Sequence, residues 1–297
     1  GATFYCYSPR TAAFAAQIAT TPGAAVAPSG SPQSWLTAVV DGSSVHVFFA
    51  LTGQWQTYVF AAPPTVVASR LVVVVTAGGS ISAISAYYGG LTTLAAPGAA
   101  LVGAYGSSAI ASSSGFVHGF SASRNLWSTY PCAAPPVVSI GDAQPAFVAL
   151  QDGSSIVFFS GYTGNFTTIQ APPAAAVVLG RAVAAVVDGW VVHGYSAFDD
   201  ATDAASCQAP PNVMMQQFFF MASDGVDVKA FSAPAGAFGT PLPGAYAIQL
   251  RAEVAGAHAF SGGPLVAAYS AFVNAWVPPP TVAGAPIVHY TSTSIIV

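Results

Sequence analysis

Two stretches of the chain repeat nearly the same phrase: "VHGFSASRNLWSTYPCAAPP" at residues 117–136 and "VVHGYSAFDDATDAASCQAPP" at residues 191–211. Each has an apolar run, an aromatic residue followed by Ser-Ala, a polar turn, a cysteine and an Ala-Pro-Pro tail. Similarity of a chain to itself at a fixed spacing is the signature of a repeat architecture. The spacing of this phrase therefore decides the fold.

The small residue that follows the aromatic recurs along the whole sequence, with successive copies 35 to 42 residues apart. Tight-turn glycines precede the apolar runs, and a bulky apolar residue follows about six positions after the small residue. The marked positions are Ser8, Ala50, Ser85, Ser121, Ser160, Ser196, Ser232 and Ser270. Eight copies of the repeat therefore account for the 297 residues.

Each copy has the pattern of four short strands. In one copy "PPVVSI" and "AFVALQ" precede an Asp152-Gly153 hairpin, and "IVFFSG" and "NFTTIQA" follow it. Asp-Gly between apolar runs is the strongest short hairpin signal, and prolines lie between strands, where a missing N–H costs no ladder bond. We predict an all-β fold, an eight-bladed β-propeller of four-stranded antiparallel blades. Residues 1–297 form this single domain, and pairing of the N- and C-terminal strands within one blade closes the ring.

The composition excludes two classes of protein. Hydrophobic residues make up 54% of the chain and charged residues 5%, with a formal charge of -4. No window holds the roughly 20 uninterrupted apolar residues that a spanning helix needs, so we expect no transmembrane segment. Six Lys and Arg in total cannot form the basic stripe that phosphate backbones require, so we expect no nucleic-acid partner.

The repeat phrases resemble those of a known family. "DGSSVHVFFALTGQWQTYVFAAPP" and "SSIVFFSGYTGNFTTIQAPP" resemble the quinoprotein-type (PQQ-like) propeller repeat, and also the kelch-like repeat. The resemblance implies the propeller architecture, which hosts enzymes, lectins and scaffolds alike. The metal ligands and base of a quinoprotein dehydrogenase match no residues here, so we expect no cofactor and assign no catalytic residue.

Two sets of side chains are weak candidates for ligand binding. Trp55, Trp127 and Trp276 could stack on sugars, or they could pack between adjacent blades. Arg70 and Arg181 share a position just before the second strand, where they could bind an anion at the channel mouth or simply be solvated.

Three further features are weak candidates for sites. Asp199, Asp200 and Asp203 could hold Ca²⁺ through oxygen ligands, although a solvated turn fits the pattern better. Asn165 begins an Asn-Phe-Thr sequon for N-glycosylation. His46, His118 and His193 fill nearly the same position in three copies, and third-strand positions related by rotation about the axis cannot converge on one ion.

The scarcity of charge predicts a surface that other molecules cover, because large exposed apolar patches mark contacts. We expect a non-catalytic extracellular or cell-surface propeller, structural or binding, whose partners are other protein subunits or copies of itself in a filament, lattice or complex. One alternative is a glycan-binding, lectin-like propeller with carbohydrate between its blades. Another is an enzyme with its site at the channel mouth.

Overall fold

The computed structural model describes residues 2–21, 24–27, 34–132, 137–139, 145–244, 246–250, 254–259, 266–277, 289–290 and 295–296. Over these residues the chain forms strands and turns and no helix. A membrane-spanning helix is accordingly not found in the described part of the chain. The chain divides into two compact units: unit 1 holds residues 1–152 and 157–167, and unit 2 holds residues 153–156 and 168–297.

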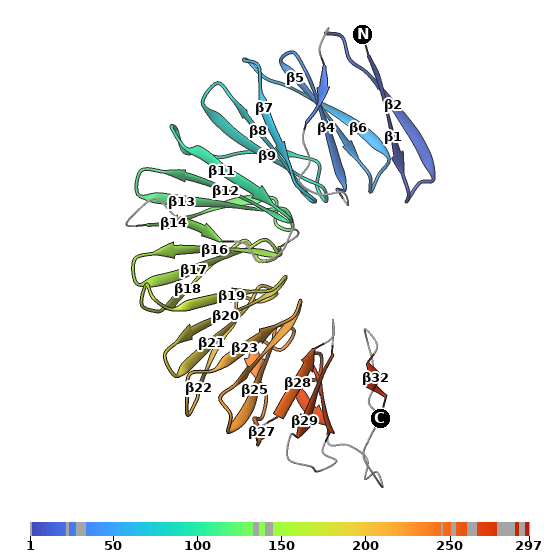
Figure 1. Ribbon diagram of the computed structural model, residues 1–297. Helices are drawn as coiled ribbons and strands as arrows, with labels where there is room; N and C mark the ends of the chain where they lie inside the picture. Colours follow the sequence, from blue (N-terminus) through green and yellow to red (C-terminus); the bar gives the residue numbers. More distant parts are fainter. Residues whose placement is uncertain are drawn as a thin grey trace. The chain divides into compact units, whose positions relative to one another are not determined.

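Unit 1 consists of antiparallel sheets whose strands follow chain order (Figure 1). The first sheet has two strands, β1 (Thr3–Ser8) and β2 (Ala13–Ile18). The next three have four strands each: β3 (Ala25–Val26), β4 (Leu36–Asp41), β5 (Ser44–Phe49) and β6 (Gln54–Val59); β7 (Thr65–Ala68), β8 (Val72–Ala77), β9 (Ser80–Ser85) and β10 (Leu91–Thr93); β11 (Ala100–Tyr105), β12 (Ser108–Ser113), β13 (Phe116–Ser121) and β14 (Leu126–Pro131).

The next sheet contains the boundary between the units: β15 (Val137–Ser139), β16 (Phe147–Asp152), β17 (Ser155–Ser160) and β18 (Phe166–Gln170). The remaining sheets belong to unit 2: β19 (Ala176–Leu179), β20 (Val183–Asp188), β21 (Val191–Ser196) and β22 (Thr202–Ser206); β23 (Asn212–Met215), β24 (Phe219–Ser223), β25 (Asp227–Ser232), β26 (Ala237–Phe238) and β27 (Leu242–Pro243); β28 (Tyr246–Leu250), β29 (Val254–Ala259), β30 (Val266–Ser270) and β31 (Ala275–Val277); β32 (His289–Tyr290) and β33 (Ile295–Ile296). The prediction of an all-β chain of four-stranded antiparallel units is confirmed.

The hairpins between second and third strands form where Asp-Gly predicts them. Gly42, Gly153 and Gly189 have φ values of 61°, 58° and 58°, in the left-handed region that glycine adopts without steric cost. These tight turns place the second and third strands in the middle of each sheet. There they carry most of the buried apolar side chains, such as Val74 and Ile84, each fully buried.

The repeated small residue ends the third strand of its sheet. In the second copy the strand ends at Phe49, so the position assigned to Ala50 is wrong by one residue. The Ala50 amide donates to the carbonyl of Trp35, just as the Ala86 amide donates to that of Leu71. The adjacent aromatics Phe48 and Phe49 make the repeat position ambiguous in the sequence, because either one could be the aromatic that precedes the end of the third strand.

In five sheets the serine that ends the third strand links its sheet to the next one. Its hydroxyl donates to the carbonyl of the residue after the equivalent position in the following sheet, and Phe49 has no hydroxyl to do so. A buried hydrogen bond of this kind contributes about 0.5–1.5 kcal/mol. The bonds run from Ser8 to Ala50 (2.7 Å), Ser85 to Ala122 (2.6 Å) and Ser121 to Gly161 (2.7 Å) in unit 1, and from Ser196 to Ala233 (2.7 Å) and Ser232 to Ala271 in unit 2.

Candidate functional site

A polar position recurs on the third strands, three residues before the strand ends. It holds His46, Ser82, His118, His193 and Lys229. The shared position predicted for the three histidines is confirmed by the strand register. The residues opposite the first four on the fourth strand are Thr57, Thr93, Thr129 and Ala204.

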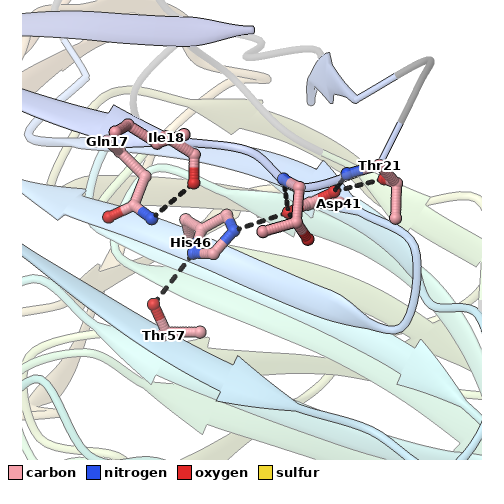
Figure 2. Close-up of polar contacts among 7 residues, drawn as sticks. Gln17, Ile18, Thr21, Asp41, His46 and Thr57 are labelled. Atoms are coloured by element: carbon pink, nitrogen blue, oxygen red, sulfur yellow. Dashed lines mark hydrogen bonds and ion pairs between the residues drawn. The ribbon is translucent and has the colours of Figure 1, made fainter. Parts of the chain in front are cut away.

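His46 lies at the centre of the most extensive of these networks (Figure 2). Its side chain is buried between two partners: Nδ1 lies 2.8 Å from Thr57 Oγ1, and Nε2 lies 3.2 Å from Asp41 Oδ2. A carboxylate only accepts hydrogen bonds, so in the neutral ring Nε2 carries the proton and Nδ1 accepts from the Thr57 hydroxyl. The network therefore assigns the tautomer of this histidine.

Asp41 has further partners in the loop that follows β2. The amides of Thr20 and Thr21 donate to its two carboxylate oxygens at 2.7 and 2.8 Å, and both threonine hydroxyls donate as well. Hydrogen bonds from the Thr21 hydroxyl and the Thr20 amide hold the pKa of Asp41 well below its usual range. The Asp41 carboxylate thus connects two elements through hydrogen bonds: the loop that follows β2 in one sheet, and the β4–β5 hairpin of the next sheet.

His118 forms a smaller network of the same kind. Its Nδ1 lies 3.0 Å from Thr129 Oγ1, and its Nε2 lies 2.9 Å from Ser113 Oγ. Burial lowers the pKa of His118, so the neutral ring is favoured there. In the preceding sheet Ser82 and Thr93 make the cross-strand bond directly at 2.9 Å.

In unit 2 the same position carries a charged cluster. The buried Lys229 ammonium contacts Asp227 Oδ1, and it lies 3.4 Å from Asp224 Oδ2. Burial opposes ionisation of Asp224, but amide hydrogen bonds from Asp227, Gln208 and Val226 outweigh it and hold its pKa well below the usual range. Because Gln208 follows β22, this aspartate also ties an inter-sheet loop to a hairpin.

These hydrogen-bond networks stabilise the contacts between strands, hairpins and the loops that connect the sheets. Asp41, His46 and Thr57 have the residue types of a nucleophilic triad, yet the carboxylate is engaged by two amides and two hydroxyls of the loop. A carboxylate so engaged stays ionised and acts as a fixed anchor. Sequence reasoning missed Thr20 and Thr21, whose only signal is their position between a fourth strand and the next sheet.

The tryptophans predicted as weak ligand residues lie on different sheets. Trp127 packs on Phe120 with ring centres 5.3 Å apart, and its Nε1 donates to the Thr92 carbonyl of the preceding sheet at 3.0 Å. Trp55 likewise packs on Phe48 and donates to the Ala15 carbonyl at 3.2 Å. These two indoles dock neighbouring sheets together.

Trp276 packs on Tyr269 at 5.3 Å in unit 2. Its buried Nε1 has no hydrogen-bond partner among the described residues. The ligand-binding role of the three tryptophans stays a prediction.

The two arginines lie just before second strands, Arg70 before β8 in unit 1 and Arg181 before β20 in unit 2. Both are partly buried. The Arg70 carbonyl accepts from the Trp35 amide of the preceding sheet at 2.9 Å, while its Nε is buried without a partner among the described residues. An anion-binding role for the arginines stays a prediction.

The three aspartates proposed for Ca²⁺ lie on the β21–β22 turn and the strand after it, with separate partners. Asp199 accepts from the Ala201 amide at 3.2 Å, and Asp200 accepts from the Tyr195 hydroxyl at 3.1 Å. Asp203 accepts from the Phe238 amide of the next sheet at 2.9 Å. In the described part of the chain no group of three or more His, Cys, Asp or Glu side chains could hold a metal.

Asn165 lies in the turn directly before β18 and is exposed. Its amide donates to Thr163 Oγ1 at 3.2 Å, and its carbonyl accepts from the Ser160 amide. The glycosylation of this sequon stays a prediction.

No protein-family model matches the chain, and no curated protein matches it. Solved structures do. Hsv2 of Kluyveromyces lactis is 16% identical over 77% of this chain and 87% of its own, with a TM-score of 0.32. BamB of Moraxella catarrhalis is 10% identical over 78% of this chain and 81% of its own, with a TM-score of 0.26.

A third match is PorZ, a surface component of the type-IX secretion system of Porphyromonas gingivalis. It is 9% identical over 88% of this chain and 38% of its own length, with a TM-score of 0.29. The chain's own successive four-stranded antiparallel sheets have the architecture of propeller blades, as the repeat phrases predicted.

Proposed function

We propose that this chain is a non-catalytic, eight-bladed propeller module that binds other protein subunits or copies of itself in an extracellular or cell-surface assembly. The observation that carries the proposal is a set of exposed aromatic side chains on the turns between third and fourth strands. Exposed apolar surface of this kind marks contact sites.

These turns repeat an apolar residue two positions after the third strand ends. In unit 1, Tyr87 and Tyr88 are 52% and 61% exposed, and in unit 2, Phe272 and Val273 are 64% and 69% exposed. Only 16 of the 297 residues are charged. Few charged groups would therefore have to be buried when a partner covers these side chains. At the equivalent position Tyr87, Phe198 and Phe272 are exposed, while Leu51 and Tyr162 are partly buried.

The proposed number of eight blades is supported by the number of sheets and by the strands with which the chain begins. Among the described residues there are six four-stranded sheets, one five-stranded sheet and two two-stranded sheets. In β1–β2 the first strand ends in the linking serine, so these are the third and fourth strands of a blade. The proposed ring takes its first and second strands from β32 and β33, which makes eight blades.

An extracellular or surface location is supported by the exposed Asn165 sequon and by the scarcity of lysine. Glycosylation of the asparagine would cover part of a surface that has few charges. A mass increase in hexose-sized steps on the native material would support this location, and an unmodified Asn165 peptide would count against it.

Sedimentation velocity over a wide concentration range tests the binding role. We expect concentration-dependent higher-mass species that weaken when Tyr87 is changed to Ser, since exposed side chains can be changed with little effect on folding. Tyr88 is left unchanged, because its hydroxyl donates to the Ser123 carbonyl of the next sheet at 3.0 Å. Trp190, 60% exposed on the β20–β21 turn at the opposite end of its sheet, provides the matched control Trp190→Ser. A strictly monomeric protein that also captures no partner subunit from its native source would contradict the proposal.

A further inference from the structure

In one sheet, two positions of the repeat carry smaller side chains than in other sheets, and both positions lie on the same face of the fourth strand. In the sheet β19–β22, Thr202 stands where other sheets carry the docking tryptophan, since it pairs with Tyr195 just as Trp127 pairs with Phe120. Ala204 stands where Thr57 and Thr129 bond to a histidine. Two side chains that fill space between sheets elsewhere are therefore replaced here by smaller ones.

A cavity of about 400 Å³ lies at this place, within unit 2. It is lined by Thr168, Ile169 and Gln170 of β18, His193 of β21, and Thr202, Asp203 and Ala204 of β22. The volume falls within the range of small-molecule sites, roughly 300–1,000 Å³. Because the fourth strand of the preceding sheet forms one wall, the cavity occupies the region that a docking indole fills in other sheets.

The smaller residues at positions 202 and 204 leave His193 without the hydrogen-bond partner that the equivalent histidines have. Its equivalents His46 and His118 are 6% and 4% exposed and engage partners through both ring nitrogens. His193 is only partly buried and lies opposite Ala204. No described residue hydrogen-bonds to its ring, so the ring nitrogens of His193 are available to a ligand in the cavity that it lines. A neutral imidazole offers one donor and one acceptor.

The charges of the other side chains that line the cavity determine which ligand charge can be accommodated. Asp203 is occupied elsewhere, because its oxygens accept from the amides of Ala204 (2.8 Å) and Phe238 (2.9 Å). The other polar side chains are two threonine hydroxyls and the imidazole, which both donate and accept, and the Gln170 amide. Gln170 Oε1 already accepts from the Ser155 hydroxyl at 3.2 Å, and its NH₂ group can donate to a ligand. With no cation in the lining, an anion such as phosphate has no counter-charge.

We propose that this cavity, defined here as the His193 pocket, binds a neutral polyhydroxylated ligand such as one sugar unit of a glycan. The hydroxyls of a sugar donate and accept in turn, which matches the donor and acceptor capacity of His193 and Thr202 and the donor capacity of the Gln170 amide. The pocket is independent of the aromatic turns that carry the assembly role. It also differs from a sugar site built on the repeated tryptophan, because in this sheet Thr202 occupies the position of that tryptophan.

Saturation-transfer NMR and titration with the methyl glycosides of glucose, galactose and mannose test the proposal, with indole and inorganic phosphate as comparison probes. We expect at least one hexoside to bind to the native protein, and phosphate not to bind. Thr202→Trp restores the docking indole, and Ala204→Thr restores the partner of His193. Each should weaken hexoside binding by about tenfold or more, equivalent to about 1.4 kcal/mol, while the melting temperature stays equal or rises.

The repeat supplies a matched control. Thr129→Ala opens the equivalent position beside His118 but leaves Trp127 in place, so hexoside binding should not change. The proposal is overturned if none of the three hexosides binds, if binding survives in both filled variants, or if indole binds more tightly than every hexoside. The two filled variants fold through contacts that other sheets already use, so loss of binding is not confused with unfolding.

Discussion

Changing Trp127 separates a packing role from a ligand-binding role. Trp127→Phe keeps an aromatic ring against Phe120 but removes the donor to the Thr92 carbonyl, 3.0 Å away. Loss of one such bond should cost about 1 kcal/mol of unfolding free energy. Trp127→Ala removes the ring as well. It should cost about 2–4 kcal/mol, somewhat below the 3–5 kcal/mol of fully buried aromatics, because the side chain is only partly buried.

Trp276→Phe is the matched control. Trp276 packs on Tyr269 at 5.3 Å and 54°, nearly the geometry of Trp127 on Phe120 at 5.3 Å and 53°, but its Nε1 has no partner among the described residues. The difference between the two Phe variants therefore isolates the hydrogen bond. Urea unfolding followed by circular dichroism measures it. Equal costs for both Phe variants, or an Ala variant as stable as the native protein, would refute the docking role of this tryptophan.

Three other perturbations test the ties between sheets. Ser85→Ala leaves the Ala122 carbonyl without its donor and should cost about 1–3 kcal/mol in urea unfolding; no change would mean that the link is idle. The lowered pKa of His118 gives a contribution to stability that is complete above about pH 6.5 and is lost as the pH falls towards the lower folded value. His118→Gln should flatten that part of the melting-temperature profile, and an unaltered slope would contradict the assignment. The lowered pKa of Asp224 gives a contribution that is complete above about pH 3.9 and lost below it. Asp224→Asn should therefore reduce this acid loss of stability and leave the part that comes from Asp41, whose pKa is lowered too; an undiminished acid loss would contradict the role of Asp224.

Much of the fold could be predicted because the relevant signals are local. An Asp-Gly pair forms the same turn wherever it occurs, as at Gly153 and Gly189, and the period places one such turn in each sheet. Phe49 shows the limit of this reasoning: two adjacent aromatics left the end of the strand ambiguous by one residue, and only the hydrogen bond of Ala50 to Trp35 resolves it.

The candidate sites were less predictable because they depend on which residues meet between sheets. In the sequence, Thr202 occupies the position at which most other copies of the repeat carry a bulky apolar residue. That it shares a cavity with His193 and Gln170 follows only from the packing of β18 against the next sheet. The contacts of Thr20 and Thr21 with Asp41 likewise depend on the path of a loop, which no short motif determines.

Amide hydrogen exchange along β1 tests the closed eight-bladed ring most directly. The Ala19 amide donates to the Ala2 carbonyl, and hydrogen-bonded pairs alternate along an antiparallel ladder. The amides of Phe4, Cys6 and Ser8 therefore face β2, and those of Tyr5 and Tyr7 face the opposite edge. If β33 pairs with that edge, the Tyr5 and Tyr7 amides will be protected as strongly as the Cys6 amide. Rapid exchange at both tyrosines beside a protected Cys6 amide would show a free edge and contradict the closed ring.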